Sequence, residues 1–187
     1  MSLSERESSA EIIDSCRRGD RDAFRALYEV HKDRVYSMAL YFHHGDASAA
    51  GDATQQVFLK LMTNIATFRG DADFATWLYR LVVNVCLDGA RRSSSLRETS
   101  DEALATLAHP DSSEHDLANR EAAAAVRTAV ASLPSKLRMP VLLRYFDELS
   151  YDQMAEALQC SAGTVASRLS RGHRLLAEKL GRFRSAK

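Results

Sequence analysis

The sequence predicts an all-α protein made of two small helical domains. Only 3 prolines and 8 glycines interrupt the 187 residues. Ala, Leu and Arg are abundant, and no alternation of β-branched residues continues for the length of a strand. With 45% hydrophobic and 27% charged residues, the chain has the composition of a folded protein and is long enough for one or two domains.

The net charge of zero conceals a strong separation of charge along the chain. Residues 93–117 carry six acidic residues and one arginine, a balance of −5, and contain no sustained apolar stripe. Residues 160–187 carry seven Lys or Arg and one Glu, a balance of +6. The acidic stretch is typical of a mobile linker or a plain solvated tether, and the basic end is typical of a nucleic-acid contact.

The sequence shows no sign of a membrane segment, a disulfide framework or a cofactor site. No apolar run approaches the roughly 20 residues that cross a bilayer, and the polar N-terminus lacks the order of a signal peptide. Cys16, Cys86 and Cys160 are odd in number and far apart, so we expect buried free thiols. We therefore expect a cytoplasmic protein without membrane insertion, metal or cofactor.

Cap and periodicity signals predict the helices of the N-terminal half. The expected ranges are about Ser9–Arg18 with Gly19 as its stop, Asp20–Phe42, Asp46–Ile65, and from Asp73 or Phe74 to Arg91-Arg92. The second range carries an apolar stripe over about six turns, which predicts a core helix. His31 lies in this stripe as a core or boundary histidine, and the His43-His44 pair has no spaced partner that would make it a metal site.

The third predicted helix has a polar face that includes Asp52, Gln55 and Gln56. These residues are either solvated positions or a protein-docking face, and their spacing alone does not decide between the two. On the fourth helix, Thr76, Arg80 and Asn84 recur at every fourth residue beside an apolar side that includes Trp77. Such a row is a plausible surface for single-stranded nucleic acid, and the alternative is an amphipathic core helix with a solvated face.

Residues 149–176 predict a helix-turn-helix. Ser150 and Gln153 form a capping-box pair at the start of one helix, and Ser161 can cap a second one after a short turn. Five hydroxyl and arginine residues lie on or beside the outward face of the second helix: Thr164, Ser167, Arg168, Arg171 and Arg174. That face suits a DNA major groove, although an ordinary helical hairpin with a solvated face would give the same pattern. Gly172 on the inward side predicts a close approach between helices.

These motifs, taken in order, resemble those of the small bacterial RNA polymerase sigma factors of the extracytoplasmic-function group. Phe68-Arg69-Gly70-Asp71, Phe74, Thr76 to Leu81, Asn84 and Arg91-Arg92 are similar to that group's promoter-melting region. Leu133-Pro134, Leu149-Ser150-Tyr151, Ala155, Leu158, Gly163-Thr164-Val165 and Ser167-Arg168-Leu169 are similar to its C-terminal DNA-binding domain. The resemblance covers about Asp20 to Arg92 and about Ala118 to Leu180, with a linker of ordinary length between.

The resemblance implies a transcription initiation factor, not an enzyme, that binds RNA polymerase core and opens promoter DNA. It implies three parts: residues 1–92 for polymerase and minus-ten contacts, 93–117 as linker, and 118–187 for the minus-thirty-five element. The implied minus-ten residues are Phe68, Arg69, Gly70, Asp71, Trp77, Arg80, Asn84, Arg91 and Arg92; the implied minus-thirty-five residues are Thr164, Ser167, Arg168, Arg171 and Arg174. Asp52, Gln55 and Gln56 would bind the clamp helices of the polymerase, the C-terminal domain would meet the flap, and an anti-sigma factor would control a stress response.

The docking motif departs from the pattern that the resemblance implies. Ala49, Ala50 and Gly51 stand where an acidic run is common, and Gln56 stands where glutamate is usual. This face therefore carries fewer charges.

Two other functions fit parts of the sequence. One is a conventional helix-turn-helix regulator with an N-terminal helical sensing domain, and the other is a helical metal or redox enzyme, for which no spaced ligand set is present.

Overall fold

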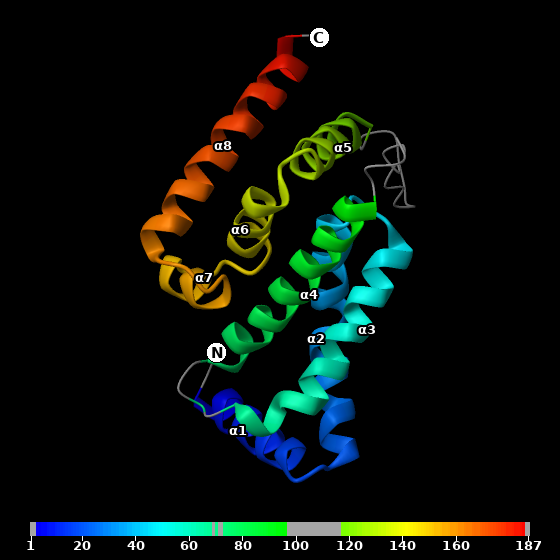
Figure 1. Ribbon diagram of the computed structural model, residues 1–187, viewed down its shortest axis with the longest axis vertical. Helices are drawn as coiled ribbons and strands as arrows, with labels where there is room; N and C mark the ends of the chain where they lie inside the picture. Colours follow the sequence, from blue (N-terminus) through cyan, green and yellow to red (C-terminus); the bar gives the residue numbers. More distant parts are fainter. Residues whose placement is uncertain (1–2, 69, 71–72, 97–116, 186–187) are drawn as a thin grey trace.

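The computed structural model describes residues 3–68, 70, 73–96 and 117–185. Within these ranges the structure consists of helices and turns, which confirms the all-α prediction (Figure 1). The elements are α1 (Leu3–Arg17), α2 (Arg21–Phe42), α3 (Ala47–Asn64), the 3-10 turn η1 (Ile65–Thr67), α4 (Phe74–Leu96), α5 (Leu117–Ala131), α6 (Ser135–Phe146), α7 (Tyr151–Ala157) and α8 (Ala162–Ser185). No helix in the described part is long and apolar enough to cross a membrane.

Side-chain caps set the helix boundaries in the N-terminal half. The carboxylate of Asp20 accepts hydrogen bonds from the backbone N–H groups of Asp22 and Ala23, and Gly19 takes a φ of 86° before it. Asp46 caps α3 in the same way, by accepting from the Ala49 N–H. These predicted boundaries are confirmed. The predicted end of α4 at Arg92 is wrong, since the helix continues to Leu96, where neither glycine nor proline interrupts it.

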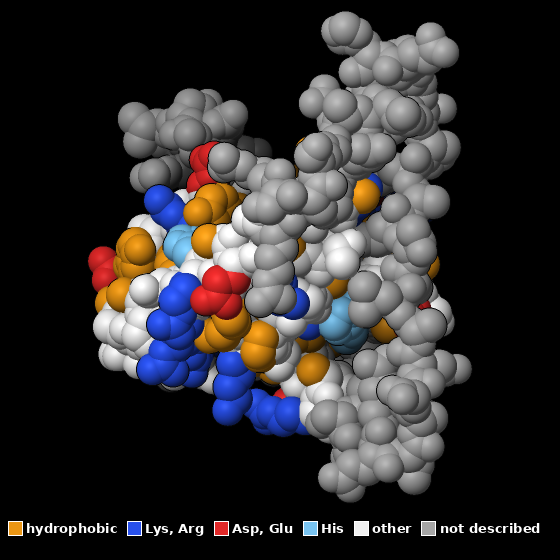
Figure 2. Space-filling model, turned by 90° about the horizontal axis from the view of Figure 1, so that it is seen from above, with side chains coloured by type: hydrophobic (Ala, Val, Ile, Leu, Met, Phe, Trp, Pro, Cys, Tyr) orange, Lys and Arg blue, Asp and Glu red, His pale blue; other side chains and the backbone are white. Residues whose placement is uncertain are grey.

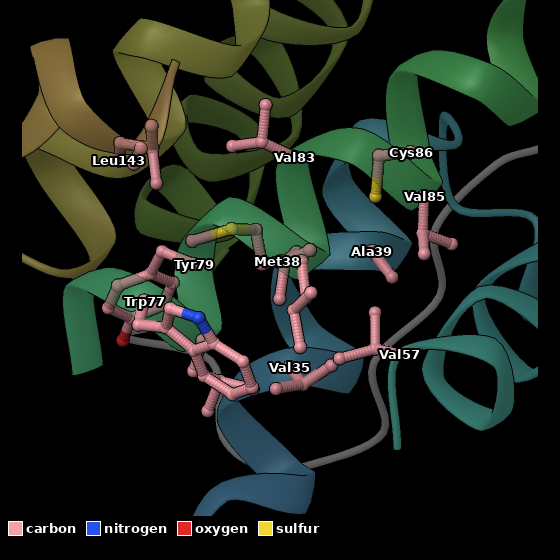
Figure 3. Close-up of a cluster of buried hydrophobic side chains, with 14 of the residues drawn as sticks. Val35, Met38, Ala39, Val57, Trp77, Tyr79, Val83, Val85, Cys86 and Leu143 are labelled. Atoms are coloured by element: carbon pink, nitrogen blue, oxygen red, sulfur yellow. The ribbon is translucent and has the colours of Figure 1, made fainter. Parts of the chain in front are cut away.

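α2, α3 and α4 pack around an apolar core. Figure 3 shows Val35 and Met38 of α2, Val57 of α3 and Cys86 of α4 within the same cluster of buried side chains. Each of these four residues is at most 1% exposed. The stripe predicted along the second helix therefore faces this core, apart from Tyr28, which is 42% exposed and lies edge-on against Phe58.

The helix-turn-helix prediction is confirmed in detail. The Ser150 hydroxyl accepts from the Gln153 N–H at 3.2 Å, and the Gln153 side chain accepts from the Ser150 N–H at 2.9 Å, which completes the capping box of α7. A Cβ added at Gly172 of α8 would lie 3.1 Å from Cγ2 of Val141 on α6, so the close helix approach is also confirmed. Tyr145 of α6 continues the apolar spacing of Val141 and Leu142 but is 65% exposed, because it lies near the end of α6 and its hydroxyl contacts His173 of α8.

The two helical domains pack directly against each other. α7 and α6 lie along α4, and α6 also contacts α2 (Figure 1). The sequence predicted two small helical domains, and their buried residues form one cluster that runs through both. Figure 3 shows Leu143 of the C-terminal domain on the same side of α4 as Val83 and Tyr79. The contact arises because α4 is apolar on the side that faces the C-terminal domain as well as on the side that faces α2 and α3.

Candidate nucleic-acid interface

The predicted recognition helix is α8, and its orientation is set by its cap and its apolar side. The Ser161 hydroxyl accepts from the Thr164 N–H at 3.2 Å and starts the helix. Val165 and Leu169 are buried against the rest of the domain, at 0% and 2% exposure. The opposite side of the helix therefore faces solvent, as the periodicity predicted.

The five predicted DNA-facing residues of α8 are not equally accessible. Ser167, Arg171 and Arg174 are exposed, whereas Thr164 and Arg168 are half-buried. The Thr164 hydroxyl lies 2.9 Å from the Ser161 hydroxyl, and Nη1 of Arg168 lies 3.8 Å from the sulfur of Cys160. No salt bridge to Arg171 or Arg174 occurs within the described residues.

An unpaired guanidinium on an exposed helix face is free to contact a base edge or a phosphate. Figure 2 shows one face of the molecule on which Lys and Arg side chains lie beside one another. Ser167, Arg171 and Arg174 therefore form the accessible part of the predicted minus-thirty-five surface.

Two of the residues predicted at the minus-ten strand lie inside the protein. Phe68, Phe74 and Trp77 form an aromatic cluster, with ring centroids 5.5 to 5.9 Å apart, and each is less than 10% exposed. The Arg17 guanidinium lies 5.7 Å from the centre of the Phe68 ring. In this conformation the rings of Phe68 and Trp77 are buried against each other and Phe74, and contact between these rings and DNA stays a prediction.

The loop and α4 hold the remaining minus-ten candidates. Gly70 is exposed with a φ of 80°, a left-handed conformation that favours glycine; Arg69 and Asp71 lie outside the described residues. Arg80 and Asn84 are half-buried and lie one turn apart on α4, and Thr76 in the same row is only 1% exposed.

Near the C-terminal end of α4, Arg91 and Arg92 are exposed. Both contact Asp88, Arg91 through a side-chain salt bridge at 3.3 Å and Arg92 through the backbone oxygen at 3.4 Å. The structure therefore places Arg80, Asn84, Arg91 and Arg92 on α4, with the two terminal arginines the most accessible.

The predicted docking residues share one exposed face of α3. Asp52, Gln55 and Gln56 are all exposed, and a hollow of about 330 Å³ lies beside them between α3 and α4. The same face continues with Leu59 and Met62, which are 54% and 56% exposed. These two apolar residues were not among the predicted docking residues, although their spacing from Asp52 and Gln55 places them on the polar side of the helix.

A buried polar cluster between the two domains was also missed. Asp147, in the turn between α6 and α7, accepts hydrogen bonds from the Tyr79 hydroxyl of α4 and from Nε of Arg34 of α2. Burial raises the pKa of the Asp147 carboxyl, and the hydrogen bonds from Tyr79 and Arg34 oppose that shift. Burial and the bond to Asp147 also raise the pKa of Tyr79. No periodic signal marks Asp147, because its partners are distant in sequence.

Arg138 of α6 is a second buried charge at the same boundary. It is 5% exposed, and its guanidinium donates to backbone oxygens of Phe42, Ala131 and Leu133. Burial lowers the pKa of Arg138 to about 10. Burial also lowers the pKa values of His31 and His43, and no cluster of metal-binding side chains occurs among the residues that the structure describes.

Comparisons with known proteins support one family. Residues 27–95 match Sigma-70 region 2, and residues 123–176 match Sigma-70, region 4. The chain is 31% identical over 183 residues to the RNA polymerase sigma-H factor of Pseudomonas aeruginosa, covering 93% of this chain and 94% of that protein. It is 31% identical over 188 residues to the ECF RNA polymerase sigma-E factor of Escherichia coli K12, covering 95% of this chain and 97% of that protein. It is 29% identical over 177 residues to the ECF RNA polymerase sigma factor SigW of Bacillus subtilis, covering 90% of this chain and 94% of that protein.

Solved structures share the fold. CnrH, in complex with the cytosolic domain of CnrY, matches with a TM-score of 0.67 at 20% identity, covering 91% of this chain and 95% of that one. The sigma factor RpoE of Bartonella quintana, in complex with the anti-sigma factor NepR, matches with a TM-score of 0.69 at 20% identity, covering 84% and 96%. The chain therefore belongs to the extracytoplasmic-function group of RNA polymerase sigma factors, which are transcription initiation factors and not enzymes.

Proposed function

We propose that this sigma factor directs RNA polymerase core to promoters through two separate DNA contacts, and that α8 reads the minus-thirty-five element. The observation that carries this proposal is the exposed face of α8, on which Ser167, Arg171 and Arg174 have no competing salt bridge within the described residues. Hydroxyl and guanidinium groups can bond to base edges and phosphates in a major groove. Thr164 and Arg168 flank this face and would tune its fit.

The second DNA contact is the minus-ten strand, which the loop after η1 and α4 would hold. The protein residues that would make this contact are Phe68, Arg69, Gly70, Asp71, Trp77, Arg80, Asn84, Arg91 and Arg92. Extracting a base from a duplex costs a few kcal/mol of stacking, so the site must offer replacement contacts. Arg91 and Arg92 are exposed for phosphate contacts, and Asn84 offers an amide that can both donate and accept.

Polymerase would bind the exposed face of α3. Asp52, Gln55 and Gln56 supply its polar part, and the clamp helices of the polymerase would be the partner. Leu59 and Met62 extend this face with apolar area, which offsets the lower charge left by Ala49–Gly51 and Gln56. The C-terminal domain would contact the polymerase flap.

An anti-sigma factor would hold the protein inactive in the cytoplasm until a stress signal arrives. RpoE of Bartonella quintana, a sigma factor of the same fold, is described in complex with the anti-sigma factor NepR, and CnrH is described in complex with the cytosolic domain of CnrY. In this scheme the functional parts are residues 1–92, the acidic segment 93–117, whose first four residues continue α4 and whose last begins α5, and residues 118–187.

Reconstitution with purified polymerase core tests the proposal. We expect the holoenzyme to select promoter DNA from a random pool, and Asp52→Ala with Gln55→Ala to weaken core binding while the helical content stays unchanged. Asp33→Ala, an exposed acid on α2, is the matched control. A double variant that binds core as tightly as the control would show that the docking face lies elsewhere.

A further inference from the structure

One carboxylate joins the two domains. Asp147 belongs to the C-terminal domain, and its side chain is fully buried in the boundary. The Tyr79 hydroxyl of α4 donates to Oδ1 at 2.5 Å, and Nε of Arg34 donates to the same oxygen. Nη2 of Arg34 also donates to the backbone oxygen of Phe146 at 3.3 Å. A single residue of the C-terminal domain thus holds two helices of the N-terminal domain.

A second set of contacts lies beside it at the end of α2. Arg138 of α6 donates to the backbone oxygen of Phe42, and its Nη1 lies 3.0 Å from Nε2 of His44. The rings of Tyr41 and Phe146 pack with centroids 4.6 Å apart. The boundary therefore combines apolar packing with charged hydrogen bonds.

The charged part of this boundary makes it reversible. A buried carboxylate is tolerated only while its partners are in place, and the other oxygen of Asp147 has no hydrogen bond among the described residues. When the domains separate, the buried Asp147 carboxylate and the Tyr79 hydroxyl regain water, whereas the Arg34 side chain is already 55% exposed in the closed form. Polar interfaces of this kind are typical of domains that come apart during function.

In the closed arrangement the two DNA-contacting helices, α4 and α8, lie too close together to reach both promoter elements. α7 packs on α4 on one side and on α8 on the other, so the strand-handling helix and the recognition helix are two helix spacings apart, roughly 20 Å. The minus-ten and minus-thirty-five elements are separated by about 25 base pairs, which is about 85 Å along the duplex at about 34 Å per turn. One straight promoter cannot meet both helices in this form.

We propose that Asp147, Arg34 and Tyr79 form an interdomain latch that holds the free sigma factor in a closed, autoinhibited form. The latch opens when the two domains take up their separate sites. The role of latch opening in promoter binding rests on the proposed function. The latch itself is a property of the free chain and can be tested without DNA or polymerase.

Single-molecule FRET on the full chain measures the fractions of closed and open molecules. The acceptor goes on Cys160, which is half-exposed in the turn before α8, and the donor on a cysteine introduced as Ser48→Cys on the exposed start of α3. Cys16 and Cys86 are buried and stay unlabelled. We expect the wild type to be mainly in the high-transfer form, and Asp147→Ala to raise the low-transfer population at least about tenfold, as expected for a lost hydrogen bond to a charged group.

Two further variants separate the latch from general damage. Tyr79→Phe removes only the hydroxyl and should also raise the open population, but it should add nothing in the Asp147→Ala background, because the two residues act through one contact. Asp152→Ala removes an exposed acid from α7 and should leave the populations unchanged.

Circular dichroism checks that every variant keeps its helical content. If Asp147→Ala and Tyr79→Phe give the same populations as Asp152→Ala, the latch does not exist. Failure of the core-binding test with an intact FRET result would count against the proposed function alone.

Discussion

Replacing Arg171 tests the base-reading role of α8 with little risk to the fold. The side chain is exposed and has no salt bridge within the described residues, so Arg171→Ala removes no stabilising contact that the structure shows. A bidentate contact from arginine to a base contributes roughly 1–3 kcal/mol, which corresponds to about a 5- to 150-fold loss of promoter affinity. Because the contact is to a base, preference at one position of the minus-thirty-five element should also relax.

The matched control is Lys179→Ala, which removes an exposed cation two turns further along α8. Promoter fragments with single substitutions, titrated with holoenzyme at two salt concentrations, separate the two roles. Loss of a phosphate contact weakens all sequences about equally and lowers the salt dependence by about one ion, whereas loss of a base contact changes the ranking of sequences. An Arg171→Ala holoenzyme that keeps the wild-type ranking of promoter sequences would refute the assignment of Arg171 as a base reader.

Three other predictions concern separate parts of the molecule. Asn84→Ala should leave duplex capture nearly intact but reduce strand opening, read by permanganate footprinting of a linear promoter with holoenzyme in excess; loss of upstream recognition instead would show that the two domain roles are exchanged. Burial raises the pKa of Cys86 to about 12, so at pH 8 only about one molecule in 10⁴ carries the thiolate, and Cys86 should react with iodoacetamide only on unfolding while Cys160 reacts in the folded protein. Burial lowers the pKa values of His31 and His43 below 6.5, so protonating these side chains costs more in the folded protein than in the unfolded chain. The folded state is therefore destabilised as the pH falls below 6.5, and the melting temperature should drop on acidification. The variant His31→Gln should make that drop shallower.

Local signals in the sequence predicted local structure well. Asp20 and Ser150 cap the helices they were expected to cap, and α3 begins beside Asp46 as expected, because a helix start depends on residues within one turn. Gly172 marked a close helix approach for a different reason, because the missing Cβ of a glycine inside a helix is visible in the sequence.

The contacts between domains were not predictable in this way. Arg34 and Asp147 are 113 residues apart, and no period or spacing relates them. Tyr145 fits the apolar stripe of its helix but lies where that helix ends, so its ring reaches solvent and His173. Leu59 and Met62 were missed for another reason, because apolar residues are expected inside even where their spacing from Asp52 and Gln55 places them on the polar side of the helix.

Closure between the two domains is an intramolecular event, which changes how any competitor must act. The twenty residues 97–116 that join α4 to α5 could span at most about 70 Å, and a tether of that order holds its ends at an effective concentration of about 1 mM. Dilution therefore does not open the molecule, and the closed fraction is independent of protein concentration. A partner present at about 1 μM must bind one domain about 1,000-fold more tightly than the other domain does in order to replace it. Weak contacts of the kind made by Asp147 are sufficient to keep such a molecule closed, and only tight partners can open it.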